Sequence, residues 1–121
     1  MNSTTSLDHK VMDALGHQTR RTILDLLHNG PQAVGALAAH LPISRPAVSK
    51  HLRILEEARL VTHTSKGASN IFYLNQDGFM AARSYIDSFW EDALTRYQQV
   101  AELMAELAET SLSEDISETA A

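Results

Sequence analysis

The stretch VGALAAHLPISRPAVSKHLRILEEARLV, residues 34–61, decides the fold of this chain. It opens with apolar residues at helical spacing, which predict a short helix over 34–40. Pro42 closes that helix, because proline has no amide hydrogen to donate and does not continue a helix. Ser44 then offers the hydroxyl that caps a second helix, so two helices joined by a tight turn are predicted.

The second of these helices is predicted to bury one face and to expose the others. Its apolar residues recur at spacings of four and three, namely Val48, Leu52 and Leu55. The other faces carry small polar or basic side chains, namely Ser44, Arg45, Ala47, Ser49, Lys50, His51 and Arg53. Such an outer surface fits the DNA major groove, where bulky side chains would block the approach to base edges. A solvated surface helix without a partner is the alternative interpretation.

Two further helices are predicted ahead of this stretch. Residues 1–6 are rich in serine and threonine and are predicted to be disordered. A helix over 7–15 and another over about 19–28 follow, each with apolar residues at helical spacing. The first of them has three apolar residues on one face, namely Leu7, Val11 and Leu15.

After Leu60 the periodicity changes to that of strands. Residues 60–64 (LVTHT) and 70–75 (NIFYLN) are rich in β-branched and aromatic residues, and the intervening SKGAS contains a turn glycine. A β-hairpin is therefore predicted.

From about residue 77 to 109 the helical period returns, and an apolar stripe runs along this long helix. A small core cannot cover such a stripe, so the predicted partner is a second copy of the chain. The predicted dimer interface consists of Leu7, Val11, Leu15, Ile86, Phe89, Trp90, Ala93, Tyr97, Val100 and Met104. The domain is expected to span 7–110, with a disordered acidic tail over 111–121.

Composition narrows the function. The chain has 121 residues and no cysteine, which excludes disulfides, thiolate metal sites and cysteine nucleophiles. The net charge is −5, but residues 44–70 alone carry +3, and such a basic block favours nucleic-acid contact. No apolar run is long enough to span a membrane and no signal peptide is visible, so we expect a cytoplasmic protein without a membrane partner.

Short helix, turn, polar-faced helix and hairpin follow one another in the order of a winged helix-turn-helix. The fold class is thus mainly α with a small β-hairpin and a long C-terminal dimerisation helix. Arg45, Ser49 and His51 are the candidates for base contacts. The candidates for backbone contacts are Arg20, Lys50, Arg53, Lys66, Ser69 and Asn70.

Three segments resemble the arsenical-resistance-regulator (ArsR) family of bacterial winged-helix repressors. They are ALGHQTRRTILDLL at 14–27, the stretch 34–61, and the strand ending IFYLN at 71–75. The resemblance implies a homodimer joined by the first and last helices, and repression by blocking a promoter. The chain departs from the thiolate metal sensors of this family, because Ala33 and Gly35 stand where those place cysteines. No metal and no cofactor is therefore predicted, and a histidine site built across protomers is the minor alternative.

Arg59 is a second departure, because relatives place glycine there in the sequence EAGLV. Glycine accepts a left-handed backbone easily, so Arg59 is expected to cost about 1 kcal/mol if that conformation is kept.

Two arginines near the start of the second helix, and the aromatic residues of the last helix, each allow two interpretations. Arg20 and Arg21 either anchor phosphates or pair with Asp13 and Asp25. The aromatic stripe of the last helix forms either the dimer core, the favoured interpretation, or a pocket for an organic small-molecule effector. Its members are Tyr85, Phe89, Trp90 and Tyr97.

These features together predict a homodimeric, sequence-specific DNA-binding repressor that recognises an inverted repeat in double-stranded DNA. The alternative function is a winged-helix protein-interaction module without DNA binding, favoured by the acidic net charge and the sparsely charged wing. An enzyme is not predicted, because no nucleophile motif, phosphate-binding loop or paired-carboxylate site occurs in the sequence.

Overall fold

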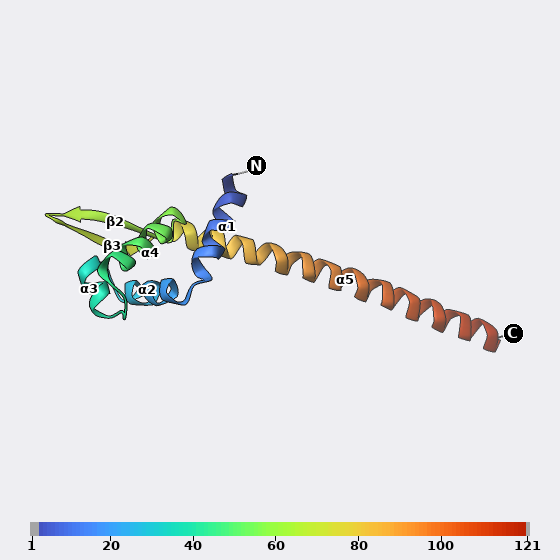
Figure 1. Ribbon diagram of the computed structural model, residues 1–121. Coiled ribbons are helices and arrows are strands. Elements are labelled where there is room, and N and C mark those ends of the chain that lie inside the picture. The colour runs from blue at the N-terminus through green and yellow to red at the C-terminus, as the bar shows by residue number, and fades with distance from the viewer. Residues whose placement is uncertain (1–2, 121) are drawn as a thin grey trace. The chain divides into compact units, whose positions relative to one another are not determined.

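Helices and three short strands alternate along the chain in this computed structural model, which describes residues 3–120 and the side chains of 7–114 (Figure 1). In chain order the elements are α1 (Ser3–Leu15), α2 (Gln18–His28), β1 (Gln32–Ala33), α3 (Val34–Ala39), α4 (Arg45–Glu57), β2 (Val61–Lys66), β3 (Ser69–Leu74) and α5 (Gln76–Ala120). The chain divides into two compact units, Met1–Tyr85 and Ile86–Ala121. The predicted class, mainly helical with a hairpin and a long C-terminal helix, is confirmed.

The core of the first unit lies between α1, α2, α4 and the sheet. Both predicted apolar faces are buried in it, Ile23, Leu24 and Leu27 from α2 and Val48, Leu52 and Leu55 from α4. Val11 of α1 also belongs to this core and has no exposed surface, so its predicted place in a dimer interface is wrong. The reason is that α1 packs its apolar stripe against α2 and α4. Leu7 and Leu15 are partly buried against the same core.

The sheet has three antiparallel strands in the order β1-β3-β2. β2 and β3 form the predicted hairpin, which projects beyond the helices of the first unit (Figure 1). Its turn is tighter than the expected SKGAS loop, because the strands continue to Lys66 and resume at Ser69. Gly67 in this turn has φ +64°, a left-handed conformation that suits glycine. β1 was not predicted; Gln32 pairs with Phe72 and Ala33 with Ile71.

The turn after α4 is held in an unusual conformation. Arg59 has φ +56°, the left-handed backbone expected if this chain keeps the turn that relatives make with glycine. Its carbonyl accepts a 2.7 Å hydrogen bond from the amide of Gly78 in the first turn of α5. A Cβ on Gly78 would lie 2.5 Å from that same carbonyl oxygen, so only glycine fits this contact.

Both terminal helices are longer than predicted. α1 begins at Ser3 rather than Leu7, and α5 runs to Ala120 rather than ending near Glu109. After Gly78 the sequence contains neither glycine nor proline, so it holds no strong signal that would end α5. The predicted domain limits and the disordered segments over 1–6 and 111–121 stay predictions.

Candidate nucleic-acid interface

The exposed surface of α4 divides into three strips, because successive residues of a helix are about 100° apart. Lys50 and Arg53 are exposed on the side opposite the buried stripe. Arg45 and Ser49 lie on the flank that faces the wing. Ala47 and the half-buried His51 lie on the other flank, and His51 contacts Arg20 of α2. The start of the helix is fixed by Ser44, whose hydroxyl oxygen accepts the amide of Ala47 at 3.3 Å.

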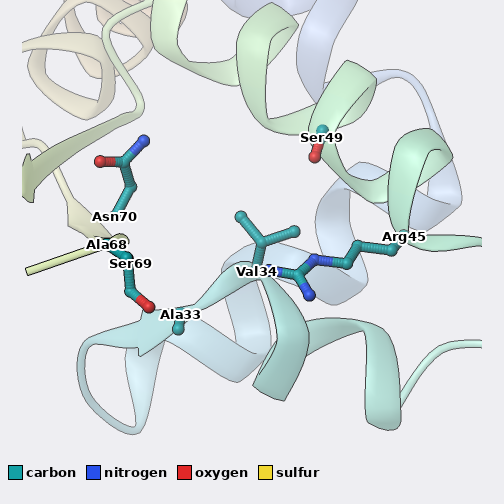
Figure 2. Close-up of a pocket in the computed structure, with 7 residues that line it drawn as sticks. All are labelled: Ala33, Val34, Arg45, Ser49, Ala68, Ser69 and Asn70. Carbon is teal, nitrogen blue, oxygen red and sulfur yellow. The ribbon is translucent and has the colours of Figure 1, made fainter.

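The flank of α4 that faces the wing borders a cleft of about 150 Å³. Figure 2 shows the residues that line it, namely Ala33, Val34, Arg45, Ser49, Ala68, Ser69 and Asn70. The side chain of Arg45 extends across the cleft toward Val34, at the start of α3. The guanidinium lies over Gly35, where a Cβ would be 3.8 Å from it, an ordinary van der Waals distance. The cleft thus joins the helix and the wing, which the sequence predicts only as separate contact surfaces.

On the opposite flank, His51 belongs to a small cationic cluster. Its ring lies 4.9 Å from that of His17, and its Nδ1 lies 3.4 Å from a guanidinium nitrogen of Arg20. Burial lowers the pKa of His51 below the ordinary value, and the charges of His17, Arg20 and Lys50 lower the pKa further. His51 therefore resists protonation in the free protein.

Arg20 and Arg21 bind backbone carbonyls at the end of α1. The Arg20 guanidinium donates to the carbonyls of Ala14 (2.9 Å) and Asp13 (3.1 Å). Arg21 donates to that of Leu15 at 2.8 Å. Among the described residues neither arginine pairs with a carboxylate, so the predicted ion pairs with Asp13 and Asp25 are wrong. These arginines supply donors to carbonyls in the last turn of α1, where the helix itself leaves carbonyls without partners; the Asp13 carbonyl also accepts the amide of Gly16 at 3.2 Å. The contact of Arg20 with DNA stays a prediction.

The wing presents short polar side chains and one cation. Lys66 ends β2 opposite Ser69, and both are exposed. The hydroxyl of Ser65 donates to Oδ1 of Asn70 at 3.2 Å, which orients the amide of Asn70. At the base of the wing, His63 of β2 lies 2.6 Å from the carboxylate of Glu56 and ties the strand to α4. This last contact was not predicted.

Most basic side chains of this surface have no acidic partner among the described residues. At this surface, among the described side chains, the ion pair is that of His63 with Glu56. Five cations therefore remain without a carboxylate, namely Arg45, Lys50, Arg53, Arg59 and Lys66. A surface of unpaired cations beside a helix of this shape is suited to a polyanion.

The second unit consists of α5 from Ile86 onward. Large apolar side chains are exposed along it, among them Ile86, Phe89, Trp90, Leu94, Tyr97, Val100, Leu103, Met104, Leu107 and Leu112. Most follow the predicted spacing of three and four, and they lie on one side of the helix. An exposed apolar face of this extent marks an interaction surface.

Neither a metal site nor a membrane span is found where the structure allows the search. Over the described residues, no group of three or more histidine, aspartate or glutamate side chains lies together. Within that same range, no helix has the length and apolar character needed to cross a bilayer.

A helix-turn-helix with a β-hairpin wing and a basic outer face defines the class of winged helix-turn-helix DNA-binding regulators. Residues 17–63 match the family model described as bacterial regulatory protein, arsR family. The chain is 45% identical over 98 residues to the HTH-type transcriptional regulator Rv2034 of Mycobacterium tuberculosis, with 81% of this chain and 92% of that protein covered. The chain belongs to the arsR family of bacterial regulatory proteins.

Two further similar proteins are a curated repressor and a solved winged helix-turn-helix domain. The transcriptional repressor SdpR of Bacillus subtilis is 40% identical over 67 residues, which cover 55% of this chain and 74% of SdpR. The solution structure of the homodimeric winged helix-turn-helix DNA-binding domain Mb0332 of Mycobacterium bovis superposes with a TM-score of 0.59 and 26% identity. That match covers 76% of this chain and 85% of Mb0332.

Proposed function

We propose that this protein is a homodimeric repressor that binds an inverted-repeat operator. The observation that carries the proposal is the set of five cations on α4, on the turn that follows it and on the wing, which have no acidic partner among the described residues. Cations that pair with phosphates release counterions, which supplies much of the affinity for DNA. The similarity to a repressor and to a homodimeric winged-helix domain supports the rest of the proposal. A repressor of this kind acts on chromosomal DNA, so we expect it in the cytoplasm.

In this proposal α4 enters the major groove with the strip opposite its buried face turned toward the bases. Lys50 and Arg53 are the outermost cations and lie closest to the DNA, while Ser49 and His51 flank them within reach of base edges. The wing follows the backbone through Lys66. Further proposed contacts are Arg20, Ser44, Arg45, Ala47, Ser69 and Asn70.

The second subunit is proposed to pack on the apolar face of α5. Its spacing of three and four continues over three heptads, which is typical of helices that pack along their length. The acidic residues Glu91, Asp92, Glu102 and Glu106 lie outside this stripe, where they stay in water. The proposed interface consists of Leu7, Leu15, Ile86, Phe89, Trp90, Ala93, Tyr97, Val100 and Met104. Two-fold symmetry then predicts half-sites about 10 base pairs apart, centre to centre.

Selection from a random duplex library tests this function. The wild type should enrich an inverted repeat, and affinity should fall steeply as salt rises. Lys50→Glu should weaken binding at least about 10-fold, because it reverses a charge at the proposed interface. The matched control, Lys10→Glu, makes the same change on α1 and should bind within about two-fold of the wild type.

A protein-interaction module remains the second candidate function, because the net charge is −5 and the wing carries one cation. That candidate predicts that no duplex is retarded at low salt while the dimer stays intact. Enrichment of any palindromic sequence contradicts it.

A further inference from the structure

The cleft between α4 and the wing combines hydrogen-bond donors from two separate elements. Arg45 and Ser49 come from α4, and Ser69 and Asn70 from β3 (Figure 2). The other lining residues are apolar, namely Ala33, Val34 and Ala68. No carboxylate lines the cleft, so its polar side chains match a negatively charged group.

The donors in this cleft are available. In the part of the chain that the structure describes, Arg45 donates no hydrogen bond. Asn70 uses its Oδ1 to accept from Ser65, which leaves the amide hydrogens of Asn70 as donors. A guanidinium, two hydroxyls and an amide can bind several oxygens of one tetrahedral oxyanion. The volume of about 150 Å³ is roughly ten times what one water needs, so a group of phosphate size fits.

The direction of the Arg45 side chain distinguishes a contact with a base from a contact with a phosphate. A base contact requires the guanidinium to project outward, alongside Lys50 and Arg53. It lies instead along the flank of α4, over Gly35 and toward Val34. Serine or alanine in place of Arg45 could not bridge α4 and the first turn of α3 in this way.

We propose that this cleft binds one phosphate of the DNA backbone, and that Arg45 is a phosphate contact rather than a base contact. The inference rests on the proposed function, because the phosphate belongs to the DNA that α4 enters. A helix in the major groove and a wing on the backbone lie on either side of one sugar-phosphate strand, and the cleft lies between these two elements. A phosphate held there fixes the register of α4 without specifying sequence.

The test compares Arg45→Gln and Asn70→Asp with two matched controls. Arg96→Gln removes the same charge from α5, and Asn75→Asp makes the same isosteric change at the other end of β3. Asn75 caps α5 by accepting the amide of Asp77 at 3.0 Å, and aspartate retains that acceptor. Arg45 and Asn70 are exposed, so both variants should keep the fold, which circular dichroism can verify.

Salt dependence is the first measurement, on a duplex enriched by the wild type and on one of mixed sequence. The logarithm of the affinity falls linearly with the logarithm of the salt concentration, and Arg45→Gln should make this fall less steep by about 0.9 per protomer. The variant should keep the sequence preference. Asn70→Asp should weaken binding to both duplexes alike, and neither control should change either quantity. A relaxed preference at one base position in Arg45→Gln, with no effect of Asn70→Asp, would overturn the proposal.

Neutral methylphosphonates, placed one at a time in the enriched duplex, locate the contact. At one position in each half-site the wild type should lose clearly more affinity than Arg45→Gln, because the variant no longer uses the charge of that phosphate. The absence of such a position also overturns the proposal, although the proposed function survives. A wild-type protein that binds neither duplex at low salt refutes the proposed function itself.

Discussion

The guanidinium of Arg20 lies 3.4 Å from Nδ1 of His51, so a residue of α2 contacts the flank of the helix proposed to enter DNA. The same guanidinium holds two carbonyls at the end of α1. His17, at the start of α2, completes the surroundings of the ring, with Lys50 next to it on α4. The protonation of His51 is therefore linked to the packing of three helices.

Lowering the pH should destabilise the protein through His51. Its pKa lies below the ordinary value in the folded chain, because of burial first and then of its cationic neighbours. The unfolded chain takes up this proton first as the pH falls, so stability should decline from about pH 7 through the lowered pKa. Urea unfolding of the wild type and of His51→Gln, at neutral and mildly acidic pH, measures the contribution.

The variant should show a shallower decline than the wild type. His9→Gln is the matched control, because His9 is an exposed histidine on α1. Equal declines in the wild type and His51→Gln would show that His51 does not carry the effect.

Gly78→Ala should destabilise the protein by about 1–3 kcal/mol, although alanine is the better helix former. The added Cβ would lie 2.5 Å from the carbonyl oxygen of Arg59 and 2.7 Å from that of Ala58, and both are backbone atoms that move only with the turn. Gly35→Ala is the control, since its Cβ would meet only a flexible guanidinium at 3.8 Å. Thermal or urea unfolding should show no loss of stability for the control. A neutral Gly78→Ala would mean that the turn relaxes freely.

Replacing Arg59 should change stability in opposite directions according to the residue introduced. Glycine adopts φ +56° without strain, so Arg59→Gly should relieve about 1 kcal/mol of backbone strain. Glycine also makes the unfolded chain freer, so the free energy of unfolding should rise by only about 0.5 kcal/mol. Arg59→Val should lose at least about 1 kcal/mol, because β-branched residues tolerate this region worst. Urea midpoints of the three proteins give the order directly. Valine as stable as arginine would contradict the left-handed conformation.

A charge within the apolar face of α5 should dissociate the proposed dimer. Tyr97 is 75% exposed in the single chain and lies in the middle of the stripe. Tyr97→Glu should raise the dimer dissociation constant at least about 100-fold, because an unpaired carboxylate would be buried. Thr95→Glu adds the same charge outside the stripe and should leave the dimer intact. Sedimentation velocity measures both, and equal behaviour would place the interface elsewhere.

The parts of this fold that depend on local signals could be predicted from the sequence. Ser44 as a cap, the stripe of Val48 and Leu52, and the change of period after Leu60 each act within a few residues. β1 could not be found, because two residues carry no periodicity and Gln32 pairs with a strand forty residues away. The contact residues of the candidate interface remain predictions, but which neighbour each strip of α4 faces could not be foreseen. That depends on how α4 packs beside α2, α3 and the wing.

The contacts of Arg20 and Arg21 also could not be predicted from patterns within one helix. Charge spacing favoured ion pairs on one helix, whereas the guanidinium groups cross a turn to reach the carbonyls of the preceding helix. Such a contact depends on the angle between two helices, which no pattern within either helix encodes. Val11 was assigned to the dimer for a related reason, since an apolar stripe does not reveal whether its partner is the same chain.

The contact between Gly78 and Arg59 has a thermodynamic corollary. It joins the first turn of α5 directly to the end of α4, with no side chain between the two backbones to absorb a displacement. Linkage across such a joint is reciprocal. A molecule that binds more tightly to one placement of that turn alters the affinity for DNA by some factor, and DNA alters the affinity for that molecule by the same factor. A ligand of that kind can therefore be detected in two ways, by its effect on DNA binding and by the effect of DNA on its own binding.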